Sequence, residues 1–254
     1  MKIVLINLPS PFLVSDTVFP PLGLLYVASY LQQQGYNPQI IDLAGENKDV
    51  VLETISQIAA DIYGISATTP QYPLAVEIKK RILPHKPVII GGTHATILPD
   101  ECSKDFDCVV SGDGEIAVLD AINLYRNRGM WSNKYFCSLC PLDSIPFPDR
   151  RLLSLSQYRY IISDRRATSI MTSRGCPYHC AFCIPRKPLR YFSLTHIINE
   201  IQDIQALGYK ALMFYDDIFT ADKNRLEQIT RGLKTEDIIY RCFTHVLLSD
   251  YDRI

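Results

Sequence analysis

The sequence has almost no excess of charge of either sign. Its 26 Lys and Arg residues nearly balance 27 Asp and Glu residues, so the net charge is -1, and no long block of one sign occurs. A basic surface supplies most of the affinity of proteins for nucleic acid, and blocks of like charge are typical of interaction tails. We therefore expect neither a nucleic-acid partner nor a tail.

Long apolar runs are also missing. The apolar stretch within residues 1–9 is too short for the core of a signal peptide, and no apolar span of 18 residues follows it. We expect a cytoplasmic protein with no membrane partner. In a reducing compartment the eight cysteines are expected to be ligands or buried thiols rather than disulfides.

What the sequence does contain is an ordinary globular composition, with 47% hydrophobic and 21% charged residues in 254, enough for one large domain or two smaller ones. Residues 1–128 alternate short apolar runs with amphipathic stretches. The expected strands are 3–8, 39–43, 62–66, 88–90 and 108–110, and the expected helices are 22–34, 50–59, 72–83 and 115–126. This α/β order predicts a flavodoxin-like, doubly wound parallel sheet that binds a ligand at the carboxyl ends of its strands.

Small and polar residues follow four of these strands, the first, third, fourth and fifth. Glycines allow a backbone to approach a ligand closely, and the last of these loops opens a helix whose N-terminus favours an anion. Taken singly, each glycine loop is equally compatible with a simple tight turn. The candidate binding residues are Ser66, Thr68, Gly91, Gly92, Gly112, Gly114 and Glu115.

Residues 129–167 lose this periodicity and predict a connector, in which Cys137 and Cys140 are expected to be incidental thiols. Residues 168–254 predict three βα units, with strands at 168–172, 211–215 and 240–246 and helices at 194–207 and 223–233. The first strand leads directly into a cysteine-rich loop, at the end of the strand where active sites of parallel βα barrels lie.

That loop holds the C-x3-C-x2-C triplet Cys176, Cys180 and Cys183. Three thiolates can hold three irons of a 4Fe-4S cluster and leave the fourth iron open for another ligand. The alternative is a structural zinc site, but zinc usually needs a second ligand pair farther along, and His179 is too close to Cys180 to complete a tetrahedron.

With these motifs in this order, the chain resembles the cobalamin-dependent radical S-adenosylmethionine (SAM) enzymes. The matching segments are PPLGL at 20–24, GGTHA at 91–95, GDGE at 112–115, IPFPDR at 145–150 and the cysteine triplet with Phe182. The resemblance implies that SAM chelates the open iron, that Phe182 packs on its adenine, and that Asp216 and Asp217 face it. It also implies that the loops of the first domain bind cobalamin. From the residues alone, the two carboxylates could equally cap a helix.

One feature departs from cobalamin domains outside this family, and two depart from the family pattern itself. The loop after the first strand lacks the Asp-x-His-x-x-Gly motif that supplies a lower cobalt ligand in other cobalamin domains, and His94 is expected to be a loop histidine that bonds its own turn. Thr244 is followed by His245 where relatives have arginine. The barrel has three βα units instead of six, so we expect an apparently truncated chain, either a fragment or one completed by a second chain.

The resemblance implies methyl transfer to an unactivated carbon, through a 5'-deoxyadenosyl radical and methylcobalamin. It further implies an electron donor such as flavodoxin or ferredoxin and a small-molecule or peptide substrate that the sequence does not identify. Two alternatives remain open: a radical cyclisation or rearrangement enzyme of the same family, and a non-catalytic protein that retains cobalamin or SAM binding.

Overall fold

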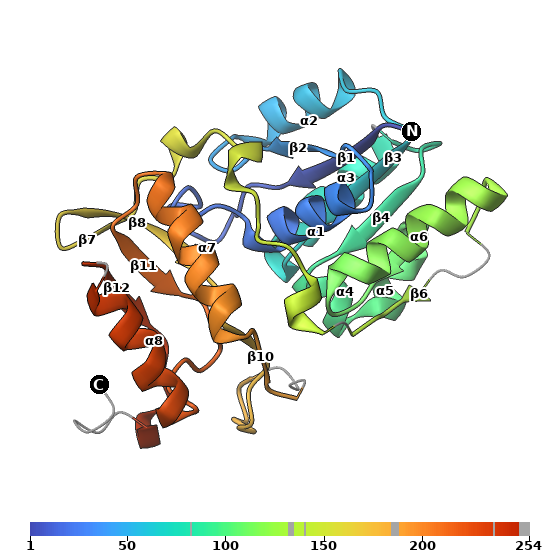
Figure 1. The fold of residues 1–254 in the computed structure, drawn as a ribbon. Coiled ribbons are helices and arrows are strands. Elements are labelled where there is room, and N and C mark those ends of the chain that lie inside the picture. Colours follow the sequence, from blue (N-terminus) through green and yellow to red (C-terminus); the bar gives the residue numbers. More distant parts are fainter. Residues whose placement is uncertain (82, 132–134, 140, 184–187, 236, 249–254) are drawn as a thin grey trace. The chain divides into compact units, whose positions relative to one another are not determined.

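The computed structural model describes residues 1–248 except 82, 132–134, 140, 184–187 and 236. Its elements fall into two compact units, whose strands and helices are labelled in Figure 1. The first unit consists of Met1–Thr17 and Pro21–Gln157, and the second consists of Val18–Pro20 and Tyr158–Ile254. Within the described residues, no helix combines the length and apolar character needed to cross a membrane.

The first unit is built on a six-stranded sheet in the order β2-β1-β3-β4-β5-β6, with every neighbouring pair parallel. The strands are β1 Ile3–Asn7, β2 Gln39–Asp42, β3 Ile62–Ser66, β4 Val88–Gly91, β5 Cys108–Val110 and β6 Tyr135–Phe136. An order that begins 2-1-3-4-5 is that of the flavodoxin-like fold, with its switch point between β1 and β3. The predicted fold class is confirmed.

Both faces of this sheet are covered, which explains why its strands are almost continuously apolar. Val4 and Ile6 of β1 join a core with Val51 of α2 and Ala75 of α3, whereas the alternate residue Leu5 packs with residues of α1 and α6. The helices are α1 Leu22–Gln33, α2 Lys48–Ser56, α3 Tyr72–Arg81, α4 Thr93–Ile97, α5 Pro99–Asp105 and α6 Gly114–Arg128.

Three elements of this unit were not predicted. Strand β6 comes from the segment expected to be a connector, and at two residues it is too short to show any periodicity. Helices α4 and α5 lie between the fourth and fifth strands, where we expected only a loop. In α5 the only buried side chain is Cys102, so this helix has no apolar stripe that the sequence could reveal.

The second unit contains the predicted half-barrel. Its sheet has the order β12-β11-β8-β7, in which β8 Arg165–Ile170, β11 Ala211–Phe214 and β12 Ile239–Cys242 are parallel. Helices α7 Leu194–Ala206 and α8 Lys223–Thr235 connect these strands. The short strand β7 Ile161–Ile162 pairs antiparallel with β8. One edge of the sheet is therefore formed by β7, and among the described residues β12 at the other edge pairs only with β11.

Candidate functional site

Backbone hydrogen bonds join the loops at the carboxyl ends of β3 and β4. The amide of Ala67 donates to Gly91 O (3.0 Å), and the amide of His94 donates to Ala67 O (3.1 Å). Gly92 has φ 92° and ψ -169°, a region that only glycine occupies readily. A Cβ on Gly92 would lie 2.8 Å from Ala67 O and 2.9 Å from Ser66 Oγ. The contact between the two loops requires glycine at position 92.

Thr96 joins the loops after β4 and β5. Its hydroxyl donates to Gly92 O (2.9 Å) and accepts from the amide of Gly112 (2.9 Å), whose φ is 83°. The structure thus brings Gly91, Gly92 and Gly112 to one edge of the sheet, as the sequence predicts for strand ends. Thr96 was missed because a threonine in a short helix gives no sequence signal for such a bridge.

The loop after β3 is joined to the loop after β1. The amide and the hydroxyl of Thr68 both lie 2.9 Å from Gln71 Oε1, and Gln71 Nε2 donates to Leu8 O (2.7 Å). Gln71 was also missed, although its position three residues after a threonine is a capping-box pattern that could have been noticed.

Gly114 and Glu115 occupy less accessible positions. A Cβ on Gly114 would lie 2.9 Å from Val27 Cγ2, so close packing of α6 on α1 is sufficient to explain this glycine. The side chain of Glu115, in the first turn of α6, is only 2% exposed.

His94 is buried beneath the same edge. Its Nδ1 lies 3.1 Å from Thr69 Oγ1, and its ring lies 4.0 Å from that of Tyr72. Its Nε2 is inaccessible and has no hydrogen-bond partner among the described residues. The bond to Thr69 crosses to the loop of the neighbouring strand, so it differs from the bond within its own turn that we expected.

The accessible groups at this edge suit a large, partly apolar cofactor such as cobalamin. Phe12, Leu13 and Val14, in the loop that follows β1, are all exposed, and Thr68 adds an exposed hydroxyl after β3. Apolar side chains beside polar loop groups are the usual lining of a cofactor site. The residues present therefore fit the predicted ligand.

In the second unit the three cysteines lie on a hairpin. Strands β9 Ser173–Arg174 and β10 Arg190–Tyr191 pair antiparallel, and we call the described residues 172–183 and 188–192 the cysteine hairpin. Cys176 and Cys180 are partly buried, Cys183 is exposed, and none of the three is joined in a disulfide. The amide of Cys183 donates to Cys180 O (2.9 Å), which makes a tight turn.

Three accessible thiols from one loop suit an iron-sulfur cluster in number and in donor type. They are not gathered into a ready metal site, since no three potential metal ligands come together among the described residues. Phe182, beside the third cysteine, is 93% exposed. Of the second cysteine pair, Cys137 is exposed and Cys140 lies outside the described residues.

The predicted acidic pair separates into two environments. The carboxylate of Asp216 accepts from Thr172 N (2.6 Å), Thr172 Oγ1 (2.5 Å) and Ser173 Oγ (2.6 Å), whereas Asp217 is exposed. Burial raises the pKa of Asp216, and the hydrogen bonds from Ser173 and Thr172 oppose that rise. Asp216 thus faces the start of the cysteine hairpin.

Three further contacts of the hairpin were missed. Arg225 of α8 donates from Nη2 to Thr172 O (3.0 Å), and its guanidinium lies 4.7 Å from the centre of the Tyr191 ring. Tyr178, between the first two cysteines, stacks on His245 at 4.1 Å. In the sequence, Arg225 is indistinguishable from the other charged residues on the solvent side of an amphipathic helix, so nothing there indicated that it contacts the hairpin.

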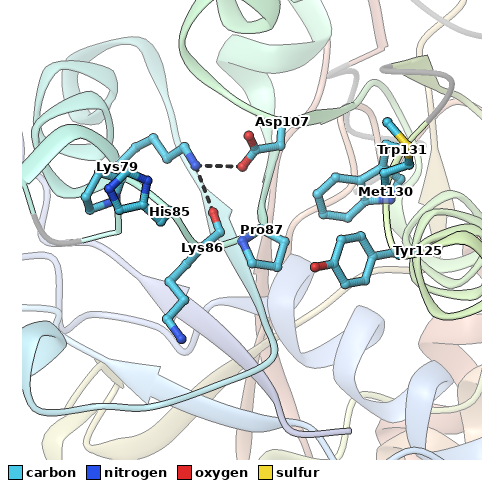
Figure 2. A pocket seen from close by; sticks show the side chains of 10 residues that line it. Lys79, His85, Lys86, Pro87, Asp107, Tyr125, Met130 and Trp131 are labelled. Atoms are coloured by element: carbon cyan, nitrogen blue, oxygen red, sulfur yellow. Dashed lines mark hydrogen bonds and ion pairs between the residues drawn. The ribbon is translucent and has the colours of Figure 1, made fainter.

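A pocket of about 360 Å³ lies at the opposite, amino-terminal side of the first unit's sheet, beside the starts of β4 and β5. Figure 2 shows the Lys79 amine between Asp107 and the backbone of Lys86. The Lys79 Nζ lies 2.6 Å from Asp107 Oδ2 and 2.8 Å from Lys86 O. The buried amine is satisfied by the protein itself, so this pocket does not compete with the carboxyl edge as a cofactor site.

Residues 12–122 match the family model described as the B12 binding domain. An uncharacterized methyltransferase of Pyrococcus horikoshii is 31% identical over 94% of this chain and 58% of its own length. Among solved structures, the cobalamin-dependent S-adenosylmethionine radical enzyme OxsB with aqua-cobalamin bound has a TM-score of 0.75 at 19% identity, covering 95% of this chain and 38% of that one.

The radical S-adenosylmethionine methyltransferase TsrM from Kitasatospora setae, with cobalamin and a [4Fe-4S] cluster bound, has a TM-score of 0.68 at 16% identity, covering 94% of this chain and 53% of that one. At these identities the two solved structures establish the fold. The chain spans between about two fifths and three fifths of the length of these proteins.

Proposed function

Because residues 12–122 match the B12 binding domain and the chain is similar to a methyltransferase and to the fold of a cobalamin-dependent radical SAM enzyme, we propose that the whole protein is a cobalamin-dependent radical SAM enzyme that transfers a methyl group to an unactivated carbon. The observation that carries this proposal is the combination of two sites in one chain. A cobalamin-type sheet with ligand-suited loops precedes a half-barrel whose first strand leads into three accessible cysteines that form no disulfide.

In this proposal Cys176, Cys180 and Cys183 hold a 4Fe-4S cluster, and Phe182 and Asp217 contact SAM. The loops after β3, β4 and β5 would hold cobalamin through Ser66, Thr68, Gly91, Gly92 and Gly112, and Gly114 and Glu115 form the packed start of α6 that follows the last of these loops. When bound, the cluster and SAM supply a 5'-deoxyadenosyl radical and cobalamin supplies the methyl group. A flavodoxin- or ferredoxin-type carrier would deliver the electron that this chemistry needs.

The cysteine assignment is tested by anaerobic reconstitution of the whole chain with iron and sulfide. We expect about four irons per chain in the wild type and a loss of most of that iron on changing Cys176, Cys180 or Cys183 to Ala. Cys137→Ala is the matched control, because this exposed thiol lies outside the hairpin, and it should retain wild-type iron. Tightly bound zinc in place of iron would contradict the assignment.

A further inference from the structure

The cysteine hairpin has very little structure of its own to fix its shape. Among its described residues, the ladder consists of two residue pairs, Arg174 with Arg190 and Ser173 with Tyr191. Isolated two-stranded hairpins are marginal in water even when they are longer. The positions of the cysteines must therefore depend on contacts from outside the hairpin.

Thr172 is the point at which these contacts meet. Its amide and its hydroxyl donate to Asp216, at the end of β11, and its carbonyl accepts from the amide of Phe192 (3.0 Å) and from Arg225 (3.0 Å). Thr172 begins the hairpin and Phe192 ends it, and both side chains are buried. One residue thus joins both stems of the hairpin to the body of the half-barrel.

Asp216 is suited to holding the first stem. Its carboxylate is 1% exposed and accepts three hydrogen bonds from two consecutive residues. An asparagine has one acceptor oxygen and adds two donors, so it cannot replace this arrangement. Arg225 holds the second stem, since the same guanidinium that binds Thr172 O also lies over the Tyr191 ring of β10.

We infer that Asp216 and Arg225 are positioning residues, which hold the two stems of the cysteine hairpin and thereby set the arrangement of its three thiols. Asp216 then acts on the cluster through Thr172 and Ser173 rather than by touching SAM. This inference rests on the proposed function for its link to a cluster, but the hairpin contacts can be tested without one.

The first test uses the whole apo chain. Cysteine reactivity follows accessibility and local opening, so Arg225→Met and Asp216→Asn should raise the reaction rates of Cys176 and Cys180 with a thiol reagent by about threefold or more. Cys183 and Cys137 are already exposed and should change little. Mass spectrometry of digested protein after timed labelling assigns the rate to each cysteine. Arg231→Met, an exposed position on the same helix, should match the wild type.

The second test uses the anaerobically reconstituted chain. The electron paramagnetic resonance spectrum of the reduced cluster should shift in Arg225→Met, whereas Arg225→Lys, which keeps the cation over Tyr191, should lie between that variant and the wild type. A purely structural role would lower the unfolding midpoint and leave the spectrum of the folded fraction unchanged.

Folded variants with wild-type thiol rates and wild-type spectra would overturn the inference. If Asp216→Asn does not fold, the thiol rates and the spectrum of Arg225→Met alone decide whether the inference holds. If the wild-type chain takes up no iron, the proposed function fails, and the thiol rates of the apo chain still decide whether Asp216 and Arg225 hold the hairpin.

Discussion

At the scale of single residues, position 92 has no room for a side chain. The backbone conformation is one that glycine alone tolerates, and Ala67 O would lie 2.8 Å from an added Cβ. Strain and overlap act together here, and both act in the protein without any cofactor. A larger residue at position 92 should therefore lower the stability of the cofactor-free protein, whether or not it also weakens cobalamin binding.

We expect Gly92→Ala to lower the free energy of unfolding by about 3 kcal/mol. Gly35→Ala is the matched control, because Gly35 also has a positive φ of 83° but nothing lies within 4 Å of its Cβ position. It should cost about 1 kcal/mol. Urea denaturation of the apo chain followed by circular dichroism measures both, and equal losses would show that the contact with Ala67 is unimportant.

His94 gives a second prediction at this scale. Its Nε2 is enclosed by protein and its Nδ1 is engaged with Thr69, so neither nitrogen is free to bind cobalt. In the cob(II)alamin state the electron paramagnetic resonance spectrum should show no nitrogen splitting from the protein, and His94→Ala should leave it unchanged. That variant should lose about 0.5 to 1.5 kcal/mol of stability from the hydrogen bond, together with some packing. Nitrogen splitting that disappears in His94→Ala would identify this residue as a ligand.

At the scale of elements, the packing of α6 on α1 depends on one close approach. Gly114 begins α6 opposite Val27 of α1, and a Cβ at position 114 would lie 2.9 Å from a valine methyl. Gly114→Ala should destabilise the protein by about 1 to 3 kcal/mol through overpacking. Val27→Ala should relieve that loss, so the double variant should be more stable than the two single losses predict when they are added. Additive losses in urea denaturation would contradict the proposed contact.

The central strands of the first unit's sheet could be predicted from the sequence because burial on both faces leaves an apolar run. The runs at 3–6 and 62–65 are of this kind. The two-residue strands β6, β7, β9 and β10 could not be predicted, because so short a segment has no periodicity. Strands β6 and β7 nonetheless form an edge of their sheets, and β9 and β10 form the stem of the cysteine hairpin.

The candidate site was predictable to a similar extent. Spacing alone singled out Cys176, Cys180 and Cys183, because a ligand motif lies within one loop. Thr96 and Arg225 bind partners far away in sequence that no local pattern encodes, and only the fold brings them together. The capping box of Gln71 could have been read from the sequence, but its bond to Leu8 O could not. The sequence placed Asp216 and Asp217 together, and burial distinguishes them.

At the scale of the whole molecule, the first unit extends well beyond residue 128. In the segment 129–157, Leu142 and Ile145 are buried, and the amide of Asp149 donates to Ser29 Oγ of α1 (2.7 Å). Strand β6 adds a sixth strand beside β5. The sequence predicted a first domain of residues 1–128, a connector at 129–167 and a partial barrel at 168–254, whereas the first compact unit continues to Gln157.

A chain of residues 1–157 should therefore fold alone, melt cooperatively and bind cobalamin in equilibrium dialysis. A chain of residues 1–128 should melt at a lower temperature, because it exposes the apolar surface that Leu142 and Ile145 cover. Thermal melting followed by circular dichroism compares the two. Equal melting temperatures would mean that the segment 129–157 contributes nothing to the first unit.

The central claim is that one chain holds both cobalamin and an iron-sulfur cluster. The most direct measurement is the content of iron, sulfide, cobalt and zinc in a single sample of the whole chain, after anaerobic reconstitution with iron, sulfide and cobalamin and removal of unbound material. The account predicts about four irons and about one cobalt per chain, with no zinc. A chain that retains zinc and neither iron nor cobalt would contradict it.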